Sequence, residues 1–146
     1  MLVAKTLINA AAGHKMMSFM DGNAGYNQIF MAPEDMNKTA FRVPGAVGLF
    51  EYSVMTFGLK NAGATYQKAI QNCLGDQIGR NAEVYVDDVV IKSKHSDTLI
   101  ADLDETFKRL REWRWKLNPT KCVFGVPLGQ FLGFLFSQRG IEASTK

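Results

Sequence analysis

Apolar residues recur every three or four positions in two long stretches of the chain, and this spacing predicts two amphipathic helices. The first helix follows Asn61, a residue type common at helix N-caps, and the second opens at Ser96 or Asp97. The residues expected to end them are Gly75 or Gly79 for the first and Asn118-Pro119 for the second. The apolar stripe of the second helix consists of Leu99, Leu103, Phe107, Leu110 and Trp113.

Shorter runs rich in β-branched and aromatic residues predict strands. They lie at 15–21, 28–31, 39–43, 49–55, 121–126 and 129–141, with turns at 32–38, 44–48 and near 138–140. A short helix over Leu2–Ala12 precedes them and is stopped by Gly13. Hairpins this short pair their strands antiparallel, so the predicted class is α+β, with helices packed on one face of an antiparallel sheet.

The segment EVYVDDVVIKS, residues 83–93, places two adjacent carboxylates, Asp87 and Asp88, between two strand-forming runs. The pattern predicts a hairpin with the acids at its turn. Asp-Asp lacks the glycine that eases such turns. At about 4 Å its repulsion costs roughly 1 kcal/mol in water and about 4 kcal/mol at an effective dielectric near 20. A bound divalent cation would offset this repulsion, so the doublet is a candidate metal site.

The composition fits one globular domain. The chain has 146 residues, 47% of them hydrophobic, and a net charge of +3 that suits a phosphate-bearing partner without requiring one. Cys73 and Cys122 lack metal-ligand spacing, which favours buried, reduced thiols. The sequence shows no apolar run near the roughly 18 residues of a membrane span and no convincing signal peptide. An intracellular protein without a membrane partner is therefore expected.

Three segments occur in a fixed order: SFMDGNAGYNQI (Ser18–Ile29), FGLKNAGATYQ (Phe57–Gln67) and YVDDVVIKS (Tyr85–Ser93). They resemble the A, B and C motifs of reverse transcriptases, in particular those of gypsy-type long-terminal-repeat retrotransposons. LNPTKCVF and FLGFLFSQRGI, which begin at Leu117 and Phe131, resemble the D and E motifs that follow. The resemblance implies a partial reverse transcriptase domain over 1–146: a polymerase palm with part of the fingers in a hairpin. The thumb, ribonuclease H and integrase are expected outside this chain.

The resemblance gives the acids a shared role. It implies Asp21 and Asp87 as the principal ligands of two Mg²⁺ ions, which Mn²⁺ could replace, with Asp88 assisting and the carbonyl of Gly22 as a further ligand. Such ions serve nucleotidyl transfer from a deoxynucleoside triphosphate to a primer 3′-hydroxyl on an RNA or DNA template. The implied activity is that of an RNA-directed DNA polymerase. Lys121, in the D motif, would protonate or neutralise the leaving pyrophosphate.

The resemblance also implies the residues that contact the substrates. Tyr26 would lie under the incoming sugar and exclude a 2′-hydroxyl, and Gln67 would lie near the template. The other implied nucleotide contacts are Gly22, Gly25, Phe57, Gly58 and Val86, and the implied primer-grip turn is Leu132 and Gly133. Gly63 stands where the family commonly has proline. Glycine loosens the first turn of the helix that follows Asn61 by up to about 1 kcal/mol.

Two alternatives remain open at this point. The chain could be a non-catalytic remnant of a retroelement that acts at most as a nucleic-acid-binding or interaction module, or an unrelated α+β protein with an accidental YVDD. The polymerase interpretation requires Asp21 to meet the later acidic doublet at neighbouring strand edges. Its expected setting is the remainder of a pol polyprotein in a cytoplasmic virus-like particle.

Overall fold

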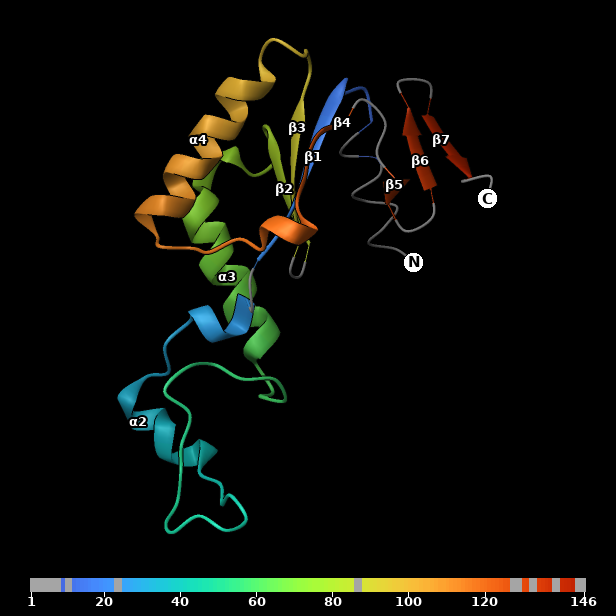
Figure 1. Ribbon diagram of the computed structural model, residues 1–146. Helices are drawn as coiled ribbons and strands as arrows, with labels where there is room; N and C mark the ends of the chain where they lie inside the picture. The colour runs from blue at the N-terminus through green and yellow to red at the C-terminus, as the bar shows by residue number, and fades with distance from the viewer. Residues whose placement is uncertain are drawn as a thin grey trace.

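Four strands form a central antiparallel sheet, and two helices cover one face of it (Figure 1). The computed structural model describes residues 9, 12–22, 25–85, 88–126, 130–131, 134–137 and 140–143. The strands are β1 (Met16–Asp21), β2 (Ala82–Tyr85), β3 (Asp88–Ser93) and β4 (Val123–Val126), in the order β2-β3-β1-β4. This is the α+β arrangement that the short hairpins predict.

The two inner strands, β1 and β3, pair along their whole length, from Met16 opposite Ser93 to Asp21 opposite Asp88. Met20 on β1 and Ile91 on β3 are almost completely buried. Burying one such side chain contributes about 1.5–3 kcal/mol, and a register slip of one residue would turn it to the other face of the sheet. The buried side chains therefore fix which residues meet at the ends of the two strands.

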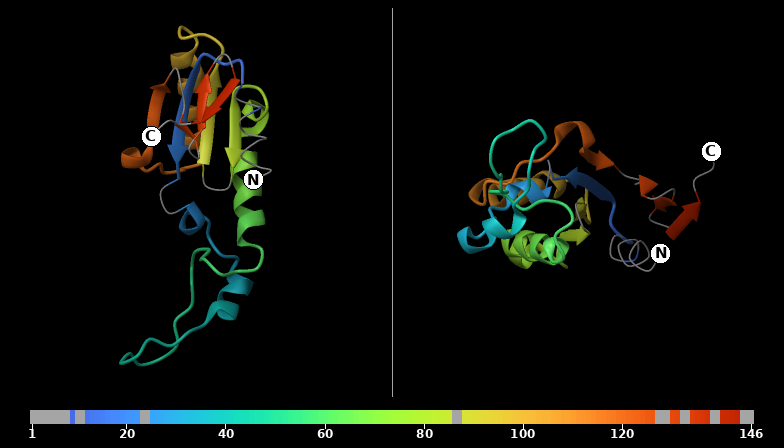
Figure 2. Two further views of the ribbon diagram at one scale, coloured as in Figure 1. Left: turned by 90° about the vertical axis from the view of Figure 1, so that its right-hand side faces the viewer. Right: turned by 90° about the horizontal axis from the view of Figure 1, so that it is seen from below.

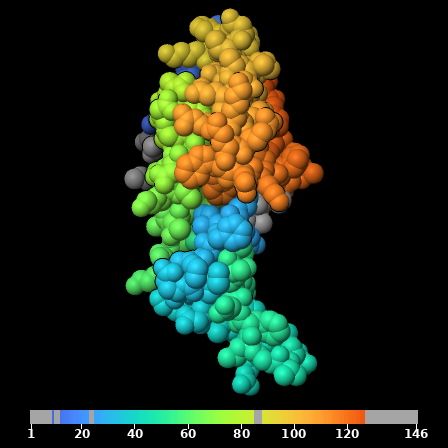
Figure 3. Space-filling view, turned by 90° about the vertical axis from the view of Figure 1, so that its left-hand side faces the viewer, coloured from blue at the N-terminus to red at the C-terminus, as the bar shows by residue number. Residues whose placement is uncertain are grey.

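Helices α3 (Ala62–Leu74) and α4 (Leu99–Glu112) cover one face of the sheet (Figure 1) and lie side by side there (Figure 3). Their buried side chains are Ala62, Tyr66, Ile70, Cys73 and Leu74 on α3, and Leu99, Leu103, Thr106 and Leu110 on α4. As predicted, α3 follows Asn61 and ends at Gly75, whose φ of +55° is cheap only for glycine. The start of α4 was expected at Ser96 or Asp97, but its N-cap is Thr98.

The end of α4 differs from the prediction, which carried the helix to Asn118. It ends at Glu112, because Arg114 adopts φ +57°, the left-handed region. The N–H of Arg114 then donates to the carbonyl of Arg111 at 3.1 Å, and the N–H of Trp115 donates to that of Leu110 at 2.8 Å. This pattern is a Schellman turn, with an arginine where a glycine is usual.

This turn puts Trp115, rather than the predicted Trp113, against the core. Trp113, predicted to extend the apolar stripe into the core, is 50% exposed. Trp115 instead packs against the core and meets the ring of Tyr66 edge-on, with centroids 5.6 Å apart. The prediction for Trp113 was wrong because α4 ends at Glu112: Trp113 is its C-cap and no longer occupies a helical position of the stripe.

Residues 30–57 extend away from the sheet as a ribbon (Figure 1, cyan to green). The predicted strands 39–43 and 49–55 are present only as single antiparallel bridges, Phe41 to Phe50 and Phe30 to Val54. The bridge at Phe30 also stands where the strand 28–31 was predicted, and helix α2 (Pro33–Met36) occupies the predicted turn. A two-stranded ribbon without a covering layer is marginal, which explains why the pairing stays short.

A second, three-stranded antiparallel sheet lies beside β4 and away from α3 and α4 (Figure 2). Its strands are β5 (Gln130–Phe131), β6 (Phe134–Ser137) and β7 (Gly140–Ala143). They occupy the region where the sequence predicts closing strands. The predicted helix Leu2–Ala12 falls almost entirely outside the described residues.

A buried hydrogen-bond network joins α4 to the sheet. Asp102 accepts one bond from Asn81 Nδ2 at 2.8 Å and another from Ser93 Oγ. Gln77 Nε2 donates to Thr106 Oγ1 at 3.0 Å. Most of these side chains are buried and Asp102 is partly buried. Each buried polar group left unpaired would cost about 1–3 kcal/mol, so the network helps to fix how α4 sits.

Both cysteines are free thiols, as the sequence indicates. Cys73 is fully buried, and burial raises the pKa of its thiol to about 12. The helices within the described residues include none long and apolar enough to cross a membrane.

Candidate active site

Asp21 and Asp88 are direct cross-strand partners at one end of the sheet. Asp21 is the last residue of β1 and Asp88 the first of β3, so the register of two buried strands places the carboxylates together. Residues directly opposite in an antiparallel pair have Cβ atoms about 4.5–5.5 Å apart, and like charges at such positions destabilise the pair. The fold therefore concentrates negative charge at this strand edge, as the polymerase interpretation requires.

The acidic doublet is only partly within the described structure. Tyr85, the last residue of β2, pairs with Asp88, so Asp88 belongs to strand β3. The prediction that both acids form the turn is therefore wrong for Asp88. Asp87 and Val86 lie outside the described residues.

Lys121 brings a positive charge to the acidic edge. Its Nζ lies 3.8 Å from Oδ2 of Asp21. The short 3-10 helix Pro119–Lys121 carries it, and the Asn118 side chain caps that helix by accepting the N–H of Thr120 at 3.2 Å. The segment Asn-Pro-Thr-Lys thus builds the turn that aims Lys121 at β1.

The chain that leaves β1 runs against the chain that leaves α4. We call residues 21–22 and 25–28 the β1-exit loop, and Trp115–Asn118 the α4-exit segment. Gly22 forms an antiparallel bridge with Leu117, and the N–H of Asn118 donates to the carbonyl of Asp21 at 2.9 Å. The α4-exit segment therefore fixes the backbone next to the first acid.

Tyr26 lies in an aromatic cluster beside this loop. Its ring centroid is 4.9 Å from that of Phe57 and 5.4 Å from that of Tyr66. Phe57 is 73% exposed, so the cluster has an open side, whereas Tyr66 is buried to 2% exposure. The half-buried ring of Tyr26 therefore packs against the exposed ring of Phe57 on one side and the fully buried ring of Tyr66 on the other.

The structure explains why two positions of the predicted site are glycine. A Cβ on Gly25 would lie 2.8 Å from Cε2 of Tyr66, so only glycine lets the loop pass under that ring. Gly58 has φ +90°, which a side chain would strain. Gly63, the departure from the family pattern, leaves its Cβ position 3.7 Å from the Tyr26 hydroxyl, an ordinary contact distance.

The remaining predicted residues are not all gathered at the acidic edge. Gln67 lies half-buried on α3, one residue after Tyr66. Leu132 and Gly133 lie outside the described residues. Three residues that contact the site were not predicted from the sequence to belong to it: Gln28, Tyr66 and Trp115. Gln28 lies inside the same motif, two residues after Tyr26, but its partner Lys116 is distant in sequence.

The donor set at the acidic edge suits a hard cation. Among the described residues there is no cluster of three or more His, Cys, Asp or Glu side chains, and Asp87 is outside that set. Asp21, Asp88 and the Gly22 carbonyl offer oxygen donors only, the chemistry that Mg²⁺ and Mn²⁺ prefer. Carboxylates held opposite each other by strand register fit a metal-binding role.

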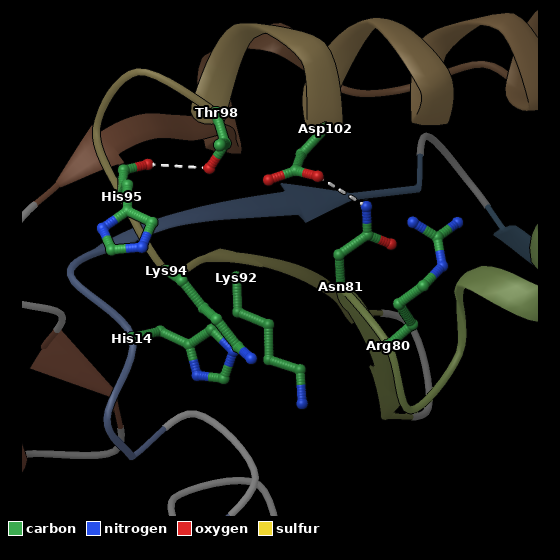
Figure 4. A pocket seen from close by; sticks show the side chains of 8 residues that line it. All are labelled: His14, Arg80, Asn81, Lys92, Lys94, His95, Thr98 and Asp102. Atoms are coloured by element: carbon green, nitrogen blue, oxygen red, sulfur yellow. Dashed lines mark hydrogen bonds between the residues drawn. The ribbon is translucent and has the colours of Figure 1, made fainter.

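A pocket of about 240 Å³ lies at the other end of β3, past Ser93 (Figure 4). Its lining consists of His14, Arg80, Asn81, Lys92, Lys94, His95, Thr98 and Asp102. Lys92 on β3 pairs with Glu83 on β2 at 2.7 Å, and Asp102 on α4 accepts from Asn81, so these charges link neighbouring strands and help to join α4 to the sheet. This hollow is separate from the acidic edge.

Comparison with known proteins identifies the class. Residues 2–136 match the family described as "Reverse transcriptase (RNA-dependent DNA polymerase)". The chain belongs to the reverse transcriptase family, whose enzymes depend on divalent metal ions.

The similar curated proteins are retrotransposon polyproteins. The chain is 34% identical over 129 residues to the Pol polyprotein from transposon gypsy of Drosophila melanogaster, and the match covers 88% of this chain and 12% of that protein. It is 33% identical over 132 residues to the Pol polyprotein from transposon opus of the same species, covering 90% and 13%. These relatives confirm the predicted gypsy-type affinity. The chain spans only about an eighth of their length.

Solved structures confirm the fold. A foamy viral protease-reverse transcriptase in complex with double-stranded DNA matches with a TM-score of 0.84 at 21% identity, covering 96% of this chain and 24% of the other. A second foamy viral structure, in complex with an RNA/DNA hybrid, gives 0.82 at 22% identity, covering 94% and 18%. The antiparallel sheet with helices on one face is thus a polymerase palm.

Proposed function

We propose that this chain forms the nucleotidyl-transfer site of an RNA-directed DNA polymerase, within a retrotransposon pol polyprotein. The observation that carries the proposal is the strand register that sets Asp21 opposite Asp88 in a chain of the reverse transcriptase family. The accidental-motif alternative gives no reason for two acids to meet across inner strands.

The acids and one carbonyl are the proposed metal ligands. Asp21 and Asp87 hold two Mg²⁺ ions, Asp88 assists, and the Gly22 carbonyl completes the set, with Mn²⁺ as a substitute. When bound, such ions stabilise negative charge on the attacking 3′-hydroxyl oxygen and on the leaving phosphate oxygen. The chain's own contribution is to hold these oxygen ligands at a fixed strand edge.

The aromatic cluster beside the β1-exit loop selects the sugar. The Tyr26 ring lies under the deoxyribose and excludes a 2′-hydroxyl by contact, because buried Tyr66 prevents it from retreating. Exposed Phe57 contributes the open wall against the base or sugar. Gly22, Gly25, Gly58 and Val86 are the further proposed contacts to the deoxynucleoside triphosphate.

Lys121 acts on the leaving group. Its Nζ is near enough to Asp21 to reach a phosphate held by the same edge, where it can donate a proton to, or neutralise, the departing pyrophosphate. Its exposure leaves the side chain free to swing toward the phosphates.

A primed template is the proposed macromolecular substrate. The foamy viral relatives of the same fold were solved with double-stranded DNA and with an RNA/DNA hybrid. By this analogy Gln67 lies near the template, and Leu132 and Gly133 grip the primer. The mild net charge of +3 suits the phosphate backbone. The remaining parts of a pol polyprotein are the proposed partners, in a cytoplasmic virus-like particle.

Primer extension tests the proposal. The chain, with the upstream and downstream segments of its pol polyprotein, is given a DNA primer on an RNA template, deoxynucleoside triphosphates and Mg²⁺, and extension is compared among wild type, Asp21→Asn and Asp87→Asn. We expect each substitution to reduce the rate by about a thousandfold or more, because a charged ligand is lost. Asp97→Asn, at an exposed position, is the matched control and should extend at the wild-type rate.

Manganese binding, followed by electron paramagnetic resonance, provides a readout that does not need turnover. Wild type should bind Mn²⁺, and Asp21→Asn should weaken that binding by about tenfold or more. Binding without extension would favour the non-catalytic alternative. Full extension by Asp87→Asn would show that the ligand assignment is wrong.

A further inference from the structure

Gln28 makes an unusual pair of contacts at the end of the β1-exit loop. Its Nε2 donates to the carbonyl oxygen of Lys116 at 2.9 Å, and its Oε1 accepts the N–H of the same residue at 2.6 Å. One carboxamide thus satisfies both polar groups that Lys116 contributes to the main chain, as a neighbouring strand would. The side chain of Lys116 takes no part in these two bonds.

These bonds tie the second end of the β1-exit loop to the α4-exit segment. The first end is already held, because the N–H of Asn118 donates to the carbonyl of Asp21. The two ties lie on either side of Tyr26. The loop is therefore anchored to one segment both before and after the residue proposed to select the sugar.

Packing links the same segment to the Tyr26 ring. Tyr66 lies between Tyr26 and Trp115, with ring centroids 5.4 Å and 5.6 Å away and near-perpendicular planes. Edge-to-face pairs of this kind contribute about 0.5–1.5 kcal/mol each. The hydrogen bonds of the loop and the aromatic contacts thus both restrict the position of the Tyr26 ring.

We infer that Gln28 is a positioning residue for sugar selection: by holding the main chain of Lys116, it fixes the height of the Tyr26 ring under the nucleotide sugar. The inference rests on the proposed function. A ring that excludes a single hydroxyl by contact must be placed closely, and a displacement of about 1 Å can cost two orders of magnitude in an active site. Gln28 supplies that placement without touching the substrate.

A volume-matched substitution tests the inference. Gln28→Met keeps the length and packing of the side chain but removes both hydrogen bonds. The measurement is the ratio of kcat/KM for ATP to that for dATP in primer extension. We expect Gln28→Met to raise this ratio about tenfold, since two hydrogen bonds of ordinary strength are lost.

Two further variants separate hydrogen bonding from other effects. Lys116→Ala changes the side chain but keeps the bonded peptide, so its ATP to dATP ratio should equal that of wild type. Gln28→Glu keeps an acceptor for the Lys116 N–H and loses the donor, so it should fall between wild type and Gln28→Met. Should Gln28→Met fail to fold by circular dichroism, Gln28→Glu decides the question.

Amide hydrogen exchange tests the contact independently of activity. The Lys116 amide should exchange slowly in wild type and about fivefold or more faster in Gln28→Met, because the acceptor is gone. An unprotected Lys116 amide in wild type would overturn the inference whatever the activity.

The outcomes also separate the two proposals. A wild-type pol polyprotein that incorporates no dATP ends the proposed function and this inference with it. An active wild type with an unchanged ratio in Gln28→Met, or the same shift in Lys116→Ala, ends only the inference.

Discussion

The Nζ of Lys121 lies 3.8 Å from Oδ2 of Asp21, so the turn after α4 places a cation against the carboxylate that ends β1. The Lys121 side chain is 65% exposed, and such a pair contributes at most about 1 kcal/mol to stability. The contact therefore adds little to stability, and the proposed role of Lys121 is toward the leaving group.

Replacing Lys121 should slow catalysis while leaving the fold intact. We expect Lys121→Met to reduce the rate of nucleotide incorporation by about a hundredfold, in the range for loss of a proton donor, with a melting temperature close to wild type. Single-turnover incorporation measures the rate. Lys38→Met, which removes another exposed ion-paired lysine, is the control. Equal rates for the two variants would exclude a chemical role for Lys121.

Two glycine-to-alanine substitutions should change the free energy of unfolding in opposite directions. Gly25→Ala forces a methyl group to within 2.8 Å of the buried Tyr66 ring and should destabilise the protein by about 1–3 kcal/mol. Gly63→Ala meets only ordinary contact in the first turn of α3 and should stabilise it by up to about 1 kcal/mol. Urea unfolding measures both. Equal shifts would mean that the Tyr66 ring yields readily.

The two aspartates of α4 should differ sharply in their contribution to stability. Asp102→Ala leaves Asn81 and Ser93 without their shared acceptor and should cost about 2–4 kcal/mol. Asp104→Ala breaks only an exposed pair with Lys108 and should cost less than about 1 kcal/mol. Chemical denaturation of the two variants measures the difference. A small loss for Asp102→Ala would show that the network does not hold α4.

Cys73 should make stability fall at alkaline pH. Burial raises its pKa from 9.0 to about 12, so the folded protein keeps a proton that the unfolded chain releases. Cys73 makes its full contribution to the free energy of unfolding below about pH 9, and this contribution is lost as the pH rises from about 9 toward 12. Urea unfolding from pH 8 to 11 should show a steeper decline for wild type than for Cys73→Ala.

The same burial predicts unequal thiol reactivity. At pH 8 a disulfide reagent should label half-buried Cys122 well before Cys73, since the thiolate is the reactive form. Thiol counting with and without denaturant measures the order. Labelling of both at one rate in the native protein would contradict the packing around Cys73.

The inner sheet and the helices were predictable because local patterns and tertiary packing agree there. The leucines of the stripe that predicts α4, Leu99, Leu103 and Leu110, are buried as expected. Asp21 meets Asp88 because buried side chains fix the register of β1 and β3. Strand propensity was misleading at 39–55, because it measures fit to a half-covered sheet, and that ribbon has no covering layer.

Other features depend on contacts that no local pattern reveals. Arg114 in a left-handed conformation looks like any helical arginine in the sequence, yet it moves Trp115 into the core in place of Trp113. The partner of Gln28 is 88 residues away, so its role becomes visible only when both segments are in place.

The separation of 88 residues between Gln28 and Lys116 affects the order in which the protein folds. Local contacts form before distant ones, because closing a long loop costs more chain entropy. α4 and its Schellman turn can form early, whereas the bonds from Gln28 to Lys116 and from Asn118 to Asp21 must wait for the two halves of the chain to dock. The acidic edge is thus expected to be among the last parts of the fold to form, and Asn118 must have been synthesised before its N–H can bond to the carbonyl of Asp21.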